Sequence, residues 1–203
     1  MQEVVANFLR GRYVDHYRDG RPSERRGNGL VGGVPGGAYP CAPGGSNDHA
    51  YIYVQPVNQD MWRDFVTAIG REDLLADARY QDAKTRWEHR DSLNEIVRAW
   101  TAARTKHEVM AILGKAGVPC GAVLDTGEIL DDPHLNARGQ IHTLEHATRG
   151  RLRLPGCPVH LSASAAPTTP APLAGEHTAD VLAEVLGLST DEVSALRARG
   201  VLG

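Results

Sequence analysis

The chain lacks the features that mark several classes of protein. Its formal net charge is only −3 over 203 residues, which gives no electrostatic reason to expect nucleic acid or an anionic membrane as a partner. No apolar run approaches the roughly 20 residues that a membrane-spanning helix needs. The first residues lack the basic start and the long apolar run of a signal peptide. These absences predict a cytoplasmic protein that binds neither nucleic acid nor a membrane.

Cysteine is also scarce. Cys41, Cys120 and Cys157 are the only three, and their odd number and wide spacing favour free thiols in a reducing cytosol over a disulfide framework. Hydrophobic residues make up 41% of the chain, which is enough for a packed core. The length suits one large domain or two small ones.

An amphipathic helix is predicted at the start of the chain. Apolar residues recur at helical spacing between residues 4 and 17, and Gly20 and Pro22 end the pattern. The apolar stripe is wide, and nothing precedes it in this sequence against which it can pack. We therefore expect this helix to need a partner surface.

A glycine-rich segment, residues 27–45, follows this helix. Gly27, Gly29 and Gly32 match the spacing of a dinucleotide-binding fingerprint. That motif needs a strand before it and a helix after it, so that the pyrophosphate meets a helix N-terminus. Neither is predicted here, so we do not expect nucleotide binding. The segment is interpreted as a flexible loop that approaches a ligand or as a plain solvent loop.

The pattern becomes that of a packed domain from residue 50. Residues 50–54 form a predicted strand. Thr105 and Glu108 form a capping box for a helix that ends at Gly117, and residues 118–124 form a buried extended segment. Two earlier helices carry the predicted core residues Trp62, Phe65, Val66, Ile69, Leu93, Ile96, Val97 and Trp100.

Short strands are predicted beyond residue 139. Residues 140–146 alternate between apolar and polar side chains, and residues 148–150 form a predicted turn. Further extended pieces are suggested by Leu152, Leu154, Val159 and Leu161. The run His142-Thr-Leu-Glu-His146 spells an inverted zincin motif, whose chemistry needs both histidines on one helical face. The alternation and the turn exclude a helix, so we predict strand histidines and no metal site.

The C-terminal part is predicted to be a linker and two helices. Residues 162–174 are rich in proline and extended. Thr178 is predicted to cap the first helix, and Ser189 with Glu192 forms a capping box for the second. Because the linker carries these amphipathic helices away from the preceding domain, we expect them to dock elsewhere.

Four motifs occur in order along the chain: Trp62-x-x-Phe65 followed by Ile69-Gly-Arg71, Ala116–Gly121, Asp132-Pro-His-Leu135, and Gly175-Glu-His-Thr178. Each is weak alone. Together they resemble the C-terminal half of the class III CoA-transferases (the CaiB/BaiF family), the group of formyl-CoA:oxalate CoA-transferase and of related 2-methylacyl-CoA racemases.

The resemblance implies an α/β fold, with a small α+β domain and a helical tail that completes a Rossmann-like large domain. It divides the chain into an N-terminal helix with a glycine-rich linker, a small domain, a proline-rich linker and the tail, at residues 1–49, 50–161, 162–174 and 175–203. In this family two chains interlock, so the expected partner is a second copy or a separate N-terminal half.

The resemblance also implies that CoA moves between an acyl-CoA thioester and a carboxylic acid through an aspartyl intermediate. The nucleophilic aspartate belongs to the family's N-terminal half, so we predict no catalytic residue in this chain. No bound cofactor is expected, because the CoA thioester is the substrate. The four aspartates in turns are interpreted as turn and cap residues: Asp48, Asp125, Asp131 and Asp132.

One family feature maps onto this sequence. A glycine loop of formyl-CoA transferases closes over the active site of the other chain, and the corresponding shielding residues here are Gly32, Gly33, Gly36 and Gly37. The loop favours a transferase over a racemase. Two alternatives stay open: a non-catalytic module that binds a separate N-terminal subunit, and a fragment of a racemase-like isomerase.

Overall fold

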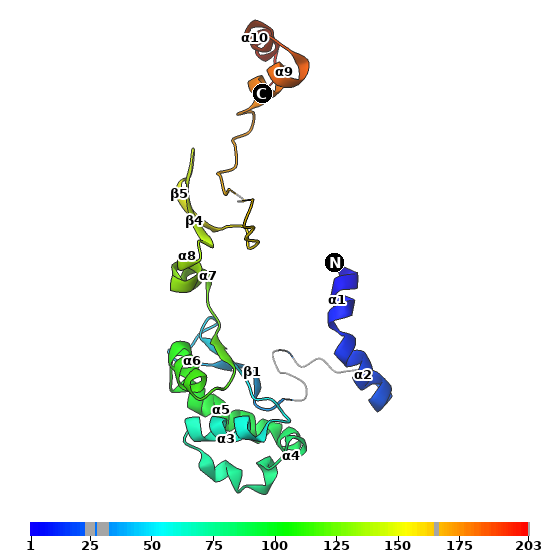
Figure 1. Ribbon diagram of the computed structural model, residues 1–203, viewed down its shortest axis with the longest axis vertical. Helices are drawn as coiled ribbons and strands as arrows, with labels where there is room; N and C mark the ends of the chain where they lie inside the picture. Colours follow the sequence, from blue (N-terminus) through cyan, green and yellow to red (C-terminus); the bar gives the residue numbers. More distant parts are fainter. Residues whose placement is uncertain (23–26, 28–32, 165–166, 203) are drawn as a thin grey trace. The chain divides into compact units, whose positions relative to one another are not determined.

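The computed structural model describes residues 1–22, 27, 33–164 and 167–202. The chain forms two compact units, Met1–Val123 and Leu124–Gly203 (Figure 1). Each unit has its own helices and its own sheet. The finer division into four segments stays a prediction.

The first unit contains helices, 3₁₀ turns and a small sheet. Its elements are α1 (Gln2–Phe8), α2 (Arg10–Asp19), β1 (Gly36–Pro40), β2 (His49–Tyr53), α3 (Gln59–Ala68), η1 (Glu72–Leu75), η2 (Ala78–Tyr80), α4 (Ala83–Glu88), α5 (Arg90–Ala102), α6 (Lys106–Lys115) and β3 (Cys120–Ala122).

The sheet has the order β1-β2-β3, and both pairings are antiparallel. Helix α5 packs against β1, and α6 packs against β2 and β3 (Figure 1). Alternate residues of the strands, such as Tyr39, Ala50 and Ile52, are buried, as expected for a sheet that covers a core with one face. The predicted helical core is confirmed: Trp62, Phe65, Val66, Ile69, Leu93 and Val97 are buried, and Ile96 and Trp100 pack against them.

The local sequence fixes both ends of α6. Thr105 and Glu108 form the predicted capping box, in which each side chain accepts a hydrogen bond from the other residue's backbone N–H. At the other end Gly117 has a φ of 73°, and the N–H of Val118 donates to the carbonyl of Leu113 at 3.0 Å. This left-handed glycine ends the helix and directs the chain into β3.

The N-terminal helix differs from the prediction of one helix over residues 4–17. The structure has two helices, α1 and α2, which break at Leu9. Asn7 and Gly11 flank the break, and both are poor helix formers. Neither helix has a buried residue, and Phe8 and Tyr17 are 82% and 86% exposed. The apolar side chains of both helices are therefore exposed, and the need for a partner surface stays a prediction.

The second unit contains a hairpin and two pairs of helices. Its elements are α7 (Thr126–Asp131), α8 (Pro133–Ala137), β4 (Ile141–His146), β5 (Gly150–Pro155), α9 (Thr178–Leu186) and α10 (Thr190–Ala198). β4 and β5 pair antiparallel. The guanidinium of Arg153 in β5 bonds the Asp131 carboxylate at 2.6 Å and the carbonyl of Leu130, so the hairpin is fastened to α7.

Two predictions for the second unit are wrong. Val159 and Leu161 lie outside any strand and are about three-fifths exposed, because Pro155 and Pro158 each remove a donor that a strand ladder needs. Thr178 is the first residue of α9 and not its cap, and His177 in the cap position makes no side-chain capping bond.

The strand prediction for the zincin-like run is confirmed. His142, Glu145 and His146 lie in β4, where histidines four residues apart cannot share the helical face that the motif requires. The capping box of Ser189 and Glu192 in α10 is also confirmed.

Candidate functional site

The glycine-rich segment ends in a strand, which corrects part of the predicted loop. Gly36 and Gly37 lie in β1 and pair with Tyr53 and Ile52 of β2. Gly33 is buried, and Gly32 lies outside the described residues. The prediction of a flexible loop through Gly36 and Gly37 is therefore wrong. Glycine has no side chain to show the alternation by which a strand is recognised.

Gly37 has a backbone reason to be glycine. Its φ is 142°, in the region that side chains disfavour, and it faces the core at a strand position. This conformational need is separate from any role in shielding a substrate.

A buried tyrosine holds the start of β1. Tyr39 is 3% exposed. Its hydroxyl accepts a hydrogen bond from the N–H of Gly36 at 3.2 Å and donates to Oδ1 of Asn94 in α5 at 2.6 Å. The glycine-rich segment is thus connected to a helix 55 residues further along the chain. This pair was not predictable from the sequence, because neither residue belongs to a motif.

The other face of the sheet presents small residues around a tyrosine. Tyr51 is 40% exposed, and its partners in the neighbouring strands are Ala38 and Gly121. The side chains of His49 and Tyr53 are on the same face of β2 as Tyr51, so only the backbone next to Tyr51, at Ala38 and Gly121, is free of large neighbours.

A buried lysine ties the turn between β1 and β2 to the end of β3. Lys106 is 5% exposed, and its Nζ donates to the carbonyl oxygens of Asn47 and Val123 at 3.1 and 3.0 Å. These bonds hold the edges of the sheet at the N-terminus of α6. The ammonium group is therefore a structural cross-link. It was not predicted from the sequence.

Two of the three thiols, those of Cys41 and Cys120, do not have the environment of a nucleophile. Burial raises the pKa of Cys41 and of Cys120, which disfavours the reactive thiolate. All three cysteines are free, as predicted.

Three of the four aspartates that were interpreted as turn and cap residues have structural roles: Asp125, Asp131 and Asp132. Asp125 caps α7 by accepting from the N–H of Glu128 at 2.9 Å, and Asp132 caps α8 by accepting from the N–H of Leu135 at 2.8 Å. Asp131 pairs with Arg153.

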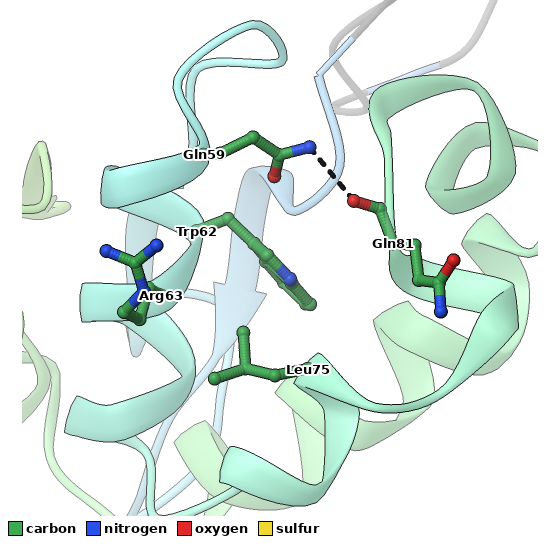
Figure 2. A pocket seen from close by; sticks show the side chains of 5 residues that line it. All are labelled: Gln59, Trp62, Arg63, Leu75 and Gln81. Carbon is green, nitrogen blue, oxygen red and sulfur yellow. Dashed lines mark hydrogen bonds between the residues drawn. The ribbon is translucent and has the colours of Figure 1, made fainter.

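A cavity of about 420 Å³ lies beside the start of α3 and is lined by Gln59, Trp62, Arg63, Leu75 and Gln81. Figure 2 shows Gln59 bridging to the backbone of Gln81 above the indole ring, with Leu75 on the other side. The indole N–H of Trp62 is buried and has no partner in the described part of the chain.

A buried cation, Arg86, lies against the ring of Trp62, one of the residues that line the cavity. The guanidinium of Arg86 lies 4.9 Å from the centre of the Trp62 ring and donates to oxygens of Gln59, Tyr80 and Pro56. Burial lowers the pKa of Arg86. Arg86 is itself only 1% exposed, so it supports the Trp62 ring and does not reach a ligand.

Neither a metal-binding cluster nor a membrane-spanning helix is found in the described part of the chain. Across residues 1–22, 27, 33–164 and 167–202, no group of three or more histidine, cysteine or acidic side chains is arranged to hold a metal ion. No helix in the same residues has the length and apolar character to cross a membrane.

Comparison with known proteins shows the family to which the chain belongs. Residues 1–178 match CoA-transferase family III. The chain is 37% identical to the formyl-CoA:oxalate CoA-transferase of Streptomyces avermitilis, over 100% of this chain and 52% of that protein. It is 36% identical to that of Escherichia coli O157:H7, over 97% of this chain and 51% of that protein.

Solved structures agree on the fold. The chain matches a CAIB/BAIF family protein from Brucella suis with a TM-score of 0.66 at 22% identity, over 87% of this chain and 44% of that one. It matches Rv3272 from Mycobacterium tuberculosis with a TM-score of 0.60 at 19% identity, over 87% and 44% of the two chains. This chain therefore belongs to CoA-transferase family III, as the motifs predicted. It spans about half the length of the curated relatives that it matches.

Proposed function

We propose that this chain is the C-terminal portion of a CoA-transferase that moves CoA from an acyl-CoA to a carboxylic acid. The observation that carries the proposal is the family match over residues 1–178, together with relatives that all bear the name of a transferase. That name favours a transferase over the racemase-like alternative. The proposed substrates are formyl-CoA and oxalate, the pair in the names of these relatives.

The proposed reaction uses an aspartate outside this chain. Its carboxylate attacks the thioester carbonyl, the C–S bond breaks, and the CoA thiolate leaves behind a mixed anhydride. The thiolate then attacks the aspartyl carbonyl, releasing the first acid and forming an aspartyl-CoA thioester. The acceptor acid repeats the two steps in reverse, so each transfer is divided into easier exchanges.

The proposed role of this chain is to cover that intermediate. The glycine-rich segment that includes Gly32 and Gly33 forms the cover, and β1, which holds Gly36 and Gly37, anchors it. The support is the close backbone approach that glycines and the small residues beside Tyr51 allow. Excluding water protects the reactive anhydride and thioester from hydrolysis.

The proposed assembly brings this chain together with an N-terminal half, and two such units interlock as a homodimer in the cytoplasm. The support is the exposed apolar side chains of α1 and α2, because neighbouring exposed apolar side chains favour association with a partner surface. A non-catalytic module would bind the same partner without contributing to transfer.

Thioester exchange tests the proposal. The chain alone and the chain co-expressed with the N-terminal half of the Streptomyces avermitilis relative are each given formyl-CoA and oxalate, and oxalyl-CoA is measured. We expect product only from the co-expressed pair. A pair that associates stably and forms no oxalyl-CoA would favour the non-catalytic module or a different substrate pair, and succinate as the acceptor separates these two results.

A further inference from the structure

The first compact unit is held up to its last residue. Val123 ends this unit, and Leu124 begins the next. The N–H of Val123 donates to the carbonyl of His49 in β2 at 2.9 Å, and the carbonyl of Val123 accepts from Nζ of the buried Lys106 at 3.0 Å. Lys106 also donates to the carbonyl of Asn47, at 3.1 Å. Both backbone polar groups of Val123 therefore belong to the first unit.

The second unit is held from its second residue onward. Asp125 is the N-cap of α7 and forms a capping box with Glu128. The N–H of Asp125 donates to Oε2 of Glu128 at 2.8 Å, and Oδ1 of Asp125 accepts from the N–H of Glu128 at 2.9 Å. The backbone N–H of Asp125 is thus already fixed to α7.

One residue lies between these two anchors. Leu124 is outside any helix or strand. The peptide group before it is held by Lys106 through the Val123 carbonyl, and the peptide group after it is held by Glu128 through the Asp125 N–H. Because peptide groups are planar, only the φ and ψ of Leu124 separate the held group of one unit from the held group of the other.

We propose that Leu124 is a single-residue hinge, and that Lys106 and Glu128 are the positioning residues that confine bending to it. Without the Lys106 bond, the movable segment extends back into Val123. Without the Glu128 bond, it extends forward into Asp125. The hinge is a property of this chain alone, and it does not depend on the proposed function.

The chain contains a matched control for each bond. Glu192 forms the same kind of capping box in α10, where its Oε2 accepts from the N–H of Ser189 at 2.8 Å. Lys115 lies on the same helix as Lys106 but is exposed. Glu192→Ala and Lys115→Met therefore repeat the two chemical changes away from the joint.

The first measurement is amide hydrogen exchange in the full chain, by NMR. Loss of one such bond is expected to speed exchange by about 5- to 10-fold, at Val123 in Lys106→Met and at Asp125 in Glu128→Ala. Lys115→Met and Glu192→Ala are expected to leave both amides at the wild-type rate. Unchanged exchange at Val123 in Lys106→Met, or at Asp125 in Glu128→Ala, would overturn the positioning roles.

The second measurement tests the hinge itself and needs no change to either anchor. The three native cysteines are replaced by alanine, and nitroxide labels are attached at Glu95→Cys in α5 and Thr143→Cys in β4, which are both exposed positions. Double electron–electron resonance then gives the distribution of distances between the labels. Dilution with unlabelled chain restricts the measurement to distances within one molecule.

Leu124→Gly is expected to widen this distribution roughly twofold, because glycine adopts positive and negative φ about equally. Val57→Gly is the control, since Val57 is 84% exposed and lies between β2 and α3 within the first unit. We expect it to keep the wild-type width. A wild-type width in Leu124→Gly, or an equal widening in Val57→Gly, would overturn the hinge.

Discussion

At the scale of single residues, a buried cation among neutral oxygens supports the first unit. Arg86 is 1% exposed, stacks on Trp62 and donates to three oxygens from separate segments, on Gln59, Tyr80 and Pro56. Each of these acceptors would be left without this partner if the guanidinium were removed. A buried acceptor without a partner is costly.

Arg86→Met is therefore expected to lower the free energy of unfolding by about 2–4 kcal/mol, measured by urea denaturation. Arg90→Met is the control, because Arg90 is only partly buried, stacks on Trp87 and bonds a single carbonyl. We expect a loss below about 1 kcal/mol there. Equal losses in the two variants would contradict the cross-linking role of Arg86.

The ionisation of Tyr39 gives a second prediction at this scale. Burial raises the pKa of Tyr39 to about 12, from an ordinary value of 10.0. The folded state therefore resists ionisation that the unfolded chain permits. The stabilisation is complete below the unfolded pKa and is lost as the pH rises from about 10 to about 12.

The difference between the unfolded and folded pKa values of Tyr39 corresponds to a loss of about 2–3 kcal/mol of unfolding free energy over that pH range. Urea denaturation at several pH values above about 9 measures this. In Tyr39→Phe, we expect the unfolding free energy to fall less steeply with pH than in the wild type. In Tyr80→Phe, we expect the part of the fall that is due to Tyr39 to remain. A slope in Tyr39→Phe equal to that of the wild type would show that Tyr39 does not carry it.

At the scale of elements, α6 has a sequence signal at each of its ends. Its capping box and its glycine stop are both local sequence features. Thr105→Ala is expected to lower the unfolding free energy by about 1 kcal/mol, because the N–H of Glu108 loses its acceptor. Thr67→Ala, at an exposed position in α3, is the control and is expected to change stability by less than about 0.5 kcal/mol.

Elements defined by local periodicity were predictable. The apolar spacing around Trp62 and Leu93 predicts the helices and core that the structure contains, and Ser189 marks the start of α10 in the same way. Strand β1 was not predictable, because it begins with two glycines and is defined by its pairing with β2. Long-range pairing leaves no periodic signal in such a sequence.

The candidate site was predicted less completely than the core. The family resemblance indicated Gly33 and its neighbours, whereas the hydrogen-bonded pair at the start of β1, Tyr39 and Asn94, is separated by 55 residues. The structural roles of Lys106 and Arg86 were not predicted from the sequence for a related reason. A long cationic side chain is normally exposed, and only the fold shows which carbonyl oxygens surround it.

At the scale of the whole molecule, the uncovered apolar helices predict association. Phe8 and Tyr17 are among the most exposed large side chains of the described residues. We expect the chain alone to self-associate in light scattering, and the double variant Phe8→Glu with Tyr17→Glu to do so less. A clean wild-type monomer that also ignores the N-terminal half would contradict the proposed assembly.

The most direct test concerns the place of the nucleophile. In the co-expressed pair with formyl-CoA, hydroxylamine traps an aspartyl anhydride or thioester as a hydroxamate, which peptide mass spectrometry locates. The account predicts a hydroxamate on an aspartate of the N-terminal half and none on this chain, because Asp125, Asp131 and Asp132 serve as caps or an ion pair. A CoA-dependent hydroxamate on any carboxylate of this chain would contradict it.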